Sequence, residues 1–378
     1  MNVYVAGTGM TKFGKHAESS IELSVEAAAK AMEDAGIAPE EIEELYVGNF
    51  AQNMFEGQAH PGPALYGSLG LKNNIKATHV ESACASGGFA LHEAFRAIKG
   101  GFAKTVMVVG VEKMTSRPTP EVTGILATAG DAFYEVPCGI TFPGYFALMA
   151  SYYLKNIGGT RDDLAEIAIK NHHHASKNPY AQFRKEITKD VYYGSPIIAE
   201  PLCLYDCSPI SDGAAAMILT SEKKDVELAS CEAAVSRMAL AERREDISWL
   251  ESAEIAGKRA YMVAGVTPED IDVAEVHDCF TIAEVQNIEA LGFYKHGEGI
   301  KAAKEKETYY DGKKPVNTDG GLKAKGHPVG ATGVSMAIEV VKQIHNEAYN
   351  QVKGAEVGLI SNMGGSGPSC VAGILRRS

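Results

Sequence analysis

The feature that most constrains the fold of this chain is a stretch that occurs twice. "AGIAPEEIEELYVGN" at 35–49 reappears as "AGVTPEDIDVAEVHD" at 264–278. In both copies the pattern predicts a helix that ends at Gly, a short acidic turn that begins at Pro, and an apolar strand. Loosely similar strand–helix units arise in any α/β protein, but here the match is in register over Ala-Gly-x-x-Pro-Glu-acid-Ile.

A second parallel follows in the same order along the chain. Small-residue loops lead into helical patterns at 82–98 and at 320–341, and apolar strands follow at 105–112 and 357–365. Two matches in the same order predict an internally duplicated α/β architecture, with strands and helices alternating in each half.

The duplication also predicts the domain organisation. We expect an N-terminal half over 1–115, completed by about 200–225, and a C-terminal half over 226–378. Residues 116–200 have no counterpart in the second half and are rich in Pro, Gly, His and Tyr, which indicates an inserted loop domain with one or two helices, placed where it could cover a site. At least two of its three consecutive histidines (172–174) are expected to be solvated. A charged segment near 221–246 should lead into the second half.

The N-terminus predicts a strand at 3–6 and then a helix. The intervening "GTGMTK" has Lys12 where a dinucleotide-binding loop needs its third glycine, so this class of site is not expected. Ser19 and Glu22 have the spacing of a capping box, and the helix that they begin should stop at Gly36.

Charge and cysteine usage exclude several classes of function. The net charge of −12 argues against nucleic acid or an anionic membrane surface as a partner, although a local pocket could still bind an anionic cofactor. The chain begins without a basic, apolar leader and has no apolar run of about 20 residues, so we expect a cytoplasmic protein. Seven scattered cysteines predict reduced thiols rather than a disulfide framework, and no second pair has zinc spacing, so no metal is expected.

Three stretches carry candidate chemistry. Cys84 stands at the expected start of a helix, where the helix dipole favours a thiolate and free N–H groups can hold an oxyanion, although most free thiols are simply buried. His327 lies in a glycine-rich loop before another helix; a lone loop histidine is usually polar surface. "SNMGGSG" at 361–367 is a strand entering a Gly-rich turn that could offer N–H donors, or an ordinary tight turn.

Taken together, these motifs resemble the thiolase family. "SACASGG" around Cys84, "GVEKMT" at 110–115, "CSPISDGAAA" at 207–216, "GGLKAKGHPVGATG" and the terminal "NMGGSGPS" occur in the family's order and cover essentially the whole chain. The resemblance is strongest to archaeal-type acetyl-CoA acetyltransferases and sterol-carrier-protein-type thiolases, which share "EVHDCF" (275–280). It implies a thiolase fold, in which duplicated βαβαβαββ halves pack in α-β-α-β-α layers with an inserted loop domain.

The chain departs from the commoner family pattern at one position. Most other thiolases have Asn-Glu-Ala-Phe in place of the His-Asp-Cys-Phe, and a second catalytic cysteine in a C-terminal turn where this chain has Asn362. The resemblance therefore implies that Cys279 supplies the second thiol. It also implies that Cys84 carries the acyl group with assistance from His327.

The resemblance further implies how the oxygen atoms of the substrate are stabilised. His327 and a water held by His277 would stabilise an enolate oxygen, and the N–H groups of Cys84 and Gly364 would stabilise the oxyanion of the acyl-enzyme.

The activity implied is that of an acetyl-CoA C-acetyltransferase, with coenzyme A as substrate and no tightly bound cofactor. A homodimer or homotetramer is expected, and a complex with HMG-CoA synthase and a small zinc- and OB-fold-containing bridging protein is a possible partnership. The alternatives are a longer-chain 3-ketoacyl-CoA thiolase, a ketoacyl synthase, and a non-catalytic scaffold or lipid-binding protein. Cys279 and "GHPVGATG" argue against the synthase, and the intact site residues argue against the scaffold.

Overall fold

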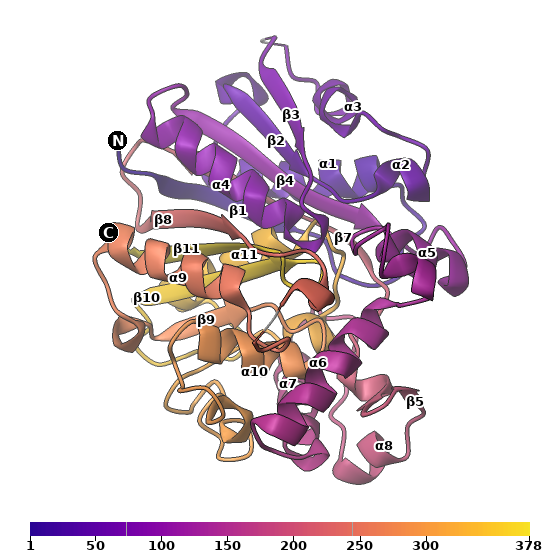
Figure 1. The fold of residues 1–378 in the computed structure, drawn as a ribbon. Helices are drawn as coiled ribbons and strands as arrows, with labels where there is room; N and C mark the ends of the chain where they lie inside the picture. Colours follow the sequence, from indigo (N-terminus) through magenta and orange to yellow (C-terminus); the bar gives the residue numbers. More distant parts are fainter. Residues whose placement is uncertain (73, 244) are drawn as a thin grey trace.

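The computed structural model describes residues 1–72, 74–243 and 245–378, and its centre is a nine-stranded sheet made of two half-sheets (Figure 1). The first half-sheet has the spatial order β3 (Lys76–Val80), β2 (Glu44–Gly48), β4 (Thr105–Lys113), β7 (Asp212–Thr220) and β1 (Tyr4–Met10). The second has the order β8 (Val226–Val235), β11 (Ser369–Arg377), β10 (Val357–Gly364) and β9 (Val273–Val276). Among the described residues, strand pairing joins the two half-sheets only between β1 and β8, at Tyr4 and Glu227.

The sequence repeat appears as repeated structure, which confirms the predicted duplication. In the first copy α1 (Ser20–Ala35) ends at Gly36 in the left-handed conformation (φ 66°), and a single turn over Pro39–Glu41 leads into β2. In the second copy α9 (Glu251–Ala264) ends at Gly265 (φ 70°), and a turn over Pro268–Asp270 leads into β9. The capping box of Ser19 and Glu22 is present at the start of α1.

Strand directions repeat as well. β2 runs parallel to β3 and β4, and β7 is antiparallel to β4 and β1. In the second half β9 runs parallel to β10, while β11 is antiparallel to β10 and β8. A single parallel bridge from Ala274 to Val316 stands in the place that β3 has in the first half.

Helices cover both faces of each half-sheet and give five layers. Helix α1 packs on β1 and β7, and α9 packs on β8 and β11. Between the half-sheets lie α4 (Ser86–Lys99) and α11 (Thr332–His345), which contact each other as well as strands of both halves. The α-β-α-β-α layering predicted from the family resemblance is confirmed.

One predicted boundary, the end of the first strand, is wrong. The first strand continues through "GTGM" to Met10, because its glycines let α1 approach: a Cβ at Gly7 would lie 2.5 Å from the carbonyl oxygen of Ala31. The charged segment near 221–246 contains β8, whose mostly buried residues form the edge of the second half-sheet.

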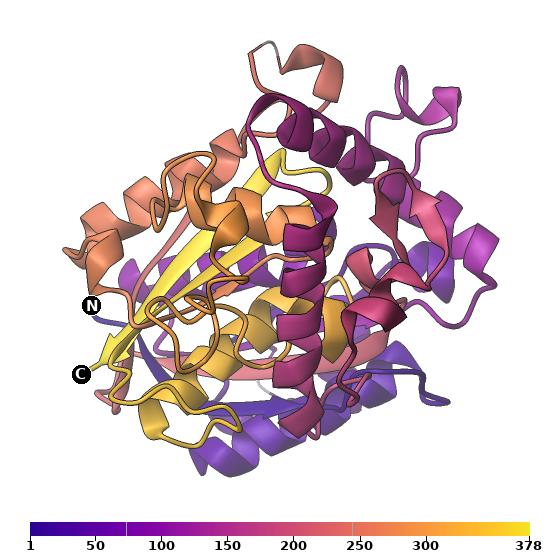
Figure 2. The same ribbon diagram turned by 90° about the horizontal axis from the view of Figure 1, so that it is seen from below.

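The segment 116–200 contains more regular structure than predicted. It holds α5 (Thr119–Ala127), α6 (Phe142–Asn156), α7 (Arg161–Lys177), α8 (Lys189–Tyr193) and the short strand β5 (Ile197–Ala199), which pairs with β6 (Leu202–Cys203). Helices α6 and α7 pack against α10 (Thr281–Ala290), so they lie across the second half (Figure 2). The short helices α2 (Gln52–Phe55) and α3 (Pro61–Ser68) follow β2.

The expectation that two of the three histidines on α7 are solvated is wrong. His172 and His174 are buried. Their Nδ1 atoms form hydrogen bonds with the carbonyl oxygens of Lys185 (3.0 Å) and Asn317 (2.9 Å), which replace contacts with water. Burial lowers the pKa of His172 to about 4 and that of His174 to about 3.

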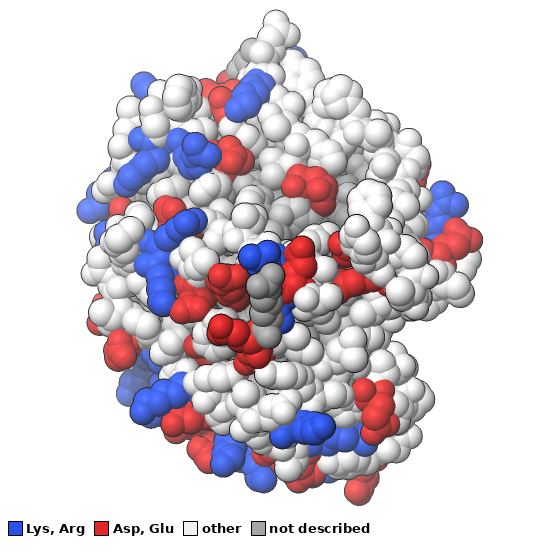
Figure 3. All heavy atoms as spheres, in the orientation of Figure 1, with Lys and Arg blue, Asp and Glu red and all other residues white. Residues whose placement is uncertain are grey.

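Charges of both signs are mixed on one face of the molecule. On the face drawn in Figure 3, Lys and Arg side chains are interspersed with Asp and Glu side chains, and no extended basic patch is visible there. Within the described ranges, no helix has the length and apolar character that crossing a bilayer requires.

Candidate active site

A cavity of about 250 Å³ brings together residues from both halves and from the inserted segment. Cys84 comes from the first half, and Cys279 and His327 come from the second. The walls are mostly apolar and include Met114, Leu126, Phe142, Phe280 and Val329. The structure therefore places three of the sequence-predicted residues on one cavity.

Cys84 is held in a tight turn at the start of α4. It lies in a single 3₁₀ turn over Ala83–Ala85, and Ala83 adopts φ 50°, a left-handed conformation that is rare for a residue with a side chain. Ser86 fixes this turn: its hydroxyl accepts from the N–H of Ser82 (2.9 Å) and donates to the carbonyl oxygen of Ala83 (2.6 Å). Strained backbone of this kind persists only where the surroundings over-determine it, and it is common at active sites.

The resting state of Cys84 differs from the expectation. Burial raises the pKa of the Cys84 thiol to about 12, although the N–H of Gly365 acts in the opposite direction. The expected thiolate is thus wrong for the free enzyme, because the cost of removing the charge from water exceeds the help of the helix terminus. A protonated thiol acts as a nucleophile only when a base takes its proton.

His327 has the structure of such a base. Its Nδ1 lies 2.7 Å from the hydroxyl of Thr332, and that hydroxyl donates to the carbonyl oxygen of Pro328 at 3.1 Å. Since the only proton of Thr332 is used, Nδ1 of His327 must donate, which leaves a lone pair on Nε2. Nε2 is buried and has no hydrogen-bond partner among the described residues, and burial keeps the pKa of His327 well below its usual value.

His277 stands beside His327 with its ring at a right angle. The ring centroids are 5.0 Å apart with an interplanar angle of 83°. His277 is fully buried, and its Nδ1 lies 3.3 Å from Nδ2 of Asn362. Nε2 has no partner in the part of the chain that the structure describes, and burial lowers the pKa of His277 to about 3. Both imidazoles are therefore neutral at rest.

Cys279 is the second thiol of the cavity. Its carbonyl oxygen accepts from the N–H of Ser208 at 2.8 Å, and the neighbouring Phe280 stacks on Phe146 with ring centroids 4.5 Å apart. These contacts fix the chain just after β9. Burial, with the nearby Cys84, raises the pKa of Cys279 well above its usual value, so this thiol is protonated at rest.

Asp278 attaches the loop of His327 to the end of β9. One of its oxygens accepts from the N–H of Leu322 (2.7 Å), and the other accepts from Nδ2 of Asn171 (2.7 Å). The loop passes close to this carboxylate at Gly321, where φ is +58° and a Cβ would overlap Asp278. Burial raises the pKa of Asp278 to about 7.

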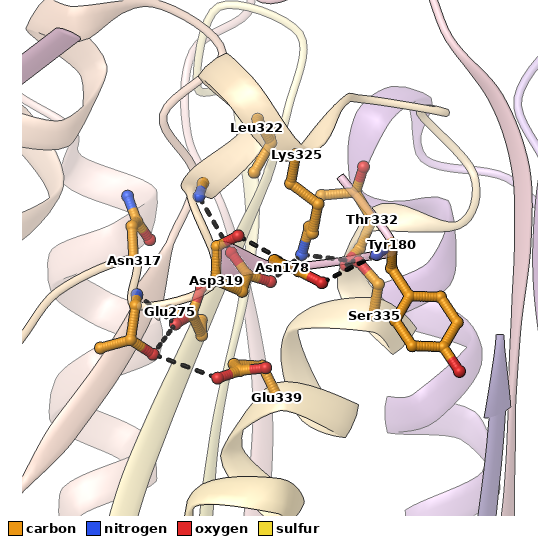
Figure 4. A network of polar contacts seen from close by, with 12 residues as sticks. Asn178, Tyr180, Glu275, Asn317, Asp319, Leu322, Lys325, Thr332, Ser335 and Glu339 are labelled. Carbon is orange, nitrogen blue, oxygen red and sulfur yellow. Dashed lines mark hydrogen bonds and ion pairs between the residues drawn. The ribbon is translucent and has the colours of Figure 1, made fainter. Parts of the chain in front are cut away.

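A buried polar network connects the same loop to β9 and α11 (Figure 4). Lys325 forms an ion pair with Asp319 and donates to the hydroxyl of Ser335 at 3.3 Å. Glu275, four residues before Cys279, accepts from both the N–H and the hydroxyl of Thr318. Burial, together with the negative charge of Asp319, raises the pKa of Glu275. Such a network is rigid because each group has few alternative partners.

Glu112 joins the loop to the first half. Its carboxylate accepts from the N–H of Gly330 (3.1 Å), the N–H of Phe50 (3.0 Å) and Nδ2 of Asn49 (3.0 Å). The same loop fills a space at Gly110, where a Cβ would overlap the carbonyl oxygen of Gly330. His327 is consequently positioned by contacts with both halves.

The turn after β10 offers two candidate oxyanion donors. The N–H that acts on the Cys84 thiol belongs to Gly365, which has φ +58° and lines the cavity. Gly364 is the last residue of β10 and pairs with Ser369 across the ladder. The assignment of Gly364 stays a prediction, and Gly365 is a second candidate beside it.

Sequence reasoning missed several residues at this site. Thr332 and Asn362 orient the two histidines, and Cys207 adds a third thiol to the cavity wall. The sequence signal for Thr332 was its position five residues after His327, which becomes meaningful only when the loop geometry is known.

Three potential metal ligands lie together in the site. Within the described residues, donor atoms of Cys84, His277 and His327 lie within 4.8 Å of one another. Ligands around tetrahedral zinc are about 3.5 Å apart, given bond lengths of roughly 2.0–2.3 Å, so the cluster would have to contract to hold the ion. The residue types fit a metal, and the expectation of none stays a prediction.

Comparison with known proteins places the whole chain beside one group. The family model described as "Thiolase, N-terminal domain" matches residues 3–223, and "Thiolase C-terminal domain-like" matches 233–377. The acetyl-CoA acetyltransferase of Methanothermobacter thermautotrophicus is 42% identical over 386 residues, which cover 100% of both chains. Sterol carrier protein 2 of Bos taurus is 35% identical and covers 96% of this chain and 70% of that protein. The solved structure of an "Ltp2-ChsH2(DUF35) aldolase" has a TM-score of 0.85 at 23% identity, covering 100% of this chain and 98% of that one.

Proposed function

Because the chain belongs to the thiolase family, we propose that it is an acetyl-CoA C-acetyltransferase. It condenses two molecules of acetyl-CoA into acetoacetyl-CoA and CoA, and it catalyses the reverse thiolysis. The observation that carries the proposal is the pair of buried thiols, Cys84 and Cys279, on one cavity beside an unprotonated Nε2 of His327. This is the minimum set for covalent acyl transfer coupled to proton transfer at carbon.

In the thiolysis direction, the first step breaks a carbon–carbon bond. Nε2 of His327 takes the proton of Cys84, and the sulfur attacks the keto carbon of acetoacetyl-CoA. The bond between C2 and C3 breaks, and the enolate that leaves takes the proton of the Cys279 thiol to become acetyl-CoA. The high pKa of Cys279 keeps that proton in place until the enolate forms.

The second step restores the enzyme. Cys279, now a thiolate, removes the proton of the CoA thiol, and the CoA sulfur attacks the acetyl group on Cys84. The N–H groups of Gly365 and Cys84 stabilise the oxyanion of this intermediate. When the intermediate collapses, Cys84 leaves and takes back its proton from His327. Condensation follows the same steps in reverse.

The apolar cavity walls favour a second candidate, a thiolase for longer 3-ketoacyl-CoA substrates. Leu126, Phe142 and Ile198 offer surface to an acyl chain beyond the acetyl group. The ratio of kcat/KM for 3-ketohexanoyl-CoA to that for acetoacetyl-CoA separates the two candidates, because a longer-chain enzyme has a ratio above one.

The decisive experiment follows loss of the enolate absorbance of acetoacetyl-CoA in the presence of CoA. We expect turnover by the wild type, none by Cys84→Ala, and at least a hundredfold loss in kcat for Cys279→Ala. Cys207→Ala is the matched control, since it removes a thiol from the same cavity that the mechanism does not use. Full activity of Cys279→Ala would refute its role as the second thiol. No turnover of any 3-ketoacyl-CoA by the wild type would favour a non-catalytic scaffold.

The proposal extends to partners and setting. CoA and acyl-CoA bind as substrates, without a tightly held cofactor, in a cytoplasmic enzyme. A homo-oligomer is proposed, and β3 supports it as an edge strand with half-exposed side chains. The similar aldolase structure carries DUF35 in its name, which supports a small bridging protein as a partner. A complex with HMG-CoA synthase is proposed from the family resemblance alone. Light scattering on the pure chain, with and without candidate partners, tests these assemblies.

A further inference from the structure

Asn362 occupies the position between the turn of Cys84 and the ring of His277. Its Oδ1 accepts from the N–H of Gly88 at 3.1 Å, and its Nδ2 donates to the carbonyl oxygen of Cys84 at 3.0 Å. In an uninterrupted α-helix, this N–H and this carbonyl would bond each other, because they are four residues apart. The amide of Asn362 thus replaces the first hydrogen bond of α4.

The polarity of these two backbone groups fixes the orientation of the amide. A backbone N–H can only donate and a backbone carbonyl can only accept, so the oxygen of Asn362 must face Gly88 and the nitrogen must face Cys84. The second N–H of the amide then points to Nδ1 of His277, 3.3 Å away. Nδ1 must accept this hydrogen bond, and in a neutral imidazole the proton is therefore on Nε2.

Glycines make room for this arrangement. A Cβ at Gly88 would lie 2.7 Å from Oδ1 of Asn362, and a Cβ at Gly333 would overlap the same atom. Asn362 itself is fully buried. A larger group at 362 has no space available.

His277 and His327 therefore have opposite tautomers. Thr332 accepts from His327 and leaves Nε2 of that ring with a lone pair, whereas Asn362 donates to His277 and leaves Nε2 of that ring with a proton. Neither Nε2 has a partner within the described ranges. The pair offers the substrate one acceptor and one donor.

We propose that Asn362 is a positioning residue that keeps the proton of neutral His277 on Nε2, so that His277 donates directly to a substrate oxygen. The donor role rests on the proposed thiolase function, but the tautomer does not. Asn362 thus couples the geometry of the nucleophile to the hydrogen-bonding state of the neighbouring histidine.

The tautomer is tested by ¹⁵N NMR of histidine-labelled protein, with the His277 signals assigned by their loss in His277→Asn. We expect a proton on Nε2 and none on Nδ1 in the wild type. In Asn362→Asp the carboxylate accepts rather than donates, so Nδ1 becomes protonated. Asn287→Asp is the matched control: Asn287 donates to the main-chain carbonyl of His277 at 3.0 Å and does not contact its ring, so Nε2–H should persist.

The kinetic test uses a response that a purely structural role does not give. At neutral pH we expect Asn362→Asp to lower kcat about a hundredfold, the cost of losing one oxyanion donor, with little change in KM. As pH falls, the carboxylate favours the imidazolium, which regains Nε2–H, so the ratio of variant to wild-type kcat should rise. For Asn362→Ala this ratio should not change with pH.

The pH dependence is assigned to His277 by its own signals. The thiol of Cys84 and the ring of His327 are titratable neighbours, and an added carboxylate raises the pKa of both, so the ¹⁵N signals of His277 are followed over the same pH range as the kcat ratio. The carboxylate of Asp278 is directed to Leu322 and Asn171.

The outcomes separate the inference from the proposed function. A wild-type proton on Nδ1 of His277, or an unchanged pattern in a folded Asn362→Asp, overturns the inference. If the wild type turns over no 3-ketoacyl-CoA but shows the expected tautomers, the proposed function fails and the positioning role of Asn362 stands.

Discussion

Replacing Thr332 by valine should disable His327 as a base without altering the shape of the site. Thr332 is buried, and its hydroxyl is the group that fixes the Nδ1–H form of His327. Valine keeps the branched shape but removes the oxygen. The Nδ1–H tautomer then has a buried donor without a partner, and the ring can move its proton to Nε2, where the base function is lost.

The size of the effect follows from the single hydrogen bond at 2.7 Å. A neutral hydrogen bond contributes about 1–1.5 kcal/mol, which corresponds to roughly a five- to twelvefold smaller population of the active tautomer. We expect kcat/KM for acetoacetyl-CoA thiolysis to fall about tenfold. The carbonyl oxygen of Pro328 also loses one of its two donors and keeps the N–H of Ala331 (2.9 Å), so the free energy of unfolding should fall by about 1 kcal/mol, mainly through the lost acceptor of His327.

Thr332→Ser is the matched control, because it keeps the oxygen and removes only a methyl group. It should retain most of the activity while losing about 1 kcal/mol of stability to the small cavity. The measurement is kcat/KM by loss of the enolate absorbance, together with urea unfolding for each variant. Wild-type kcat/KM in Thr332→Val, or an equal loss in Thr332→Ser, would show that the hydroxyl does not set the tautomer.

Two further predictions concern stability. Gly321→Ala should lower the free energy of unfolding by roughly 3–5 kcal/mol, because left-handed strain adds to the loss of the contact between Asp278 and Leu322. Gly36 is also left-handed but has open space around it, so Gly36→Ala should lower the free energy of unfolding by only about 1 kcal/mol in the same urea titrations. Equal losses in the two variants would contradict this reasoning. Unfolding free energy should vary little between about pH 4.5 and 6.5 and fall steeply below. A buried histidine with a lowered pKa reduces the stability of the protein as pH falls below the usual histidine pKa of about 6.5. A buried carboxyl with a raised pKa reduces it as pH rises from the usual carboxyl pKa of about 4. Each group contributes about 1.4 kcal/mol per pH unit, so the two sets oppose each other within this window. The groups are His172, His174, His277 and His327 against Glu112, Glu275, Asp278 and Glu339. Urea midpoints at intervals of one pH unit check this, and a steady rise from pH 4.5 to 6.5 would count against it.

The sequence predicts the frame of the molecule well because the frame depends on local patterns. The two copies of helix, Gly, Pro turn and strand appear with their predicted ends at Gly36 and Gly265. Cys84, His327 and Cys279 meet on one cavity, as the family resemblance implies. Local signals fail where a residue's partner is remote: the glycines of β1 were expected to end the strand, but α1 packs against them.

Ionisation and hydrogen-bonding states could not be predicted from the sequence. The dipole argument for Cys84 takes no account of burial, which arises only when residues remote in the sequence, such as Phe55, Met114 and Val329, pack in the same cluster. The tautomers of the histidines depend on Thr332 and Asn362, and the latter is 85 residues from its imidazole along the chain. The choice between Gly364 and Gly365 depends on the direction of one amide in the final turn.

The glycines of the first half have a consequence for how duplicated proteins divide their work. Gly48 is the repeat counterpart of His277, and it pairs across the ladder with Gly110, as His277 meets Asn362 in the second half. Where one copy has an imidazole and an amide, the other has two residues without side chains. The backbone of Ser86 and Gly87 fills the space beside Gly48, and the Gly330 end of the loop that carries His327 fills the space beside Gly110. At Gly110 the first half thus accommodates a loop of the second half. A symmetric scaffold with two equivalent positions thus has one catalytic centre, and a histidine at Gly48 would collide with the backbone of Ser86 and Gly87 at the start of α4 instead of creating another.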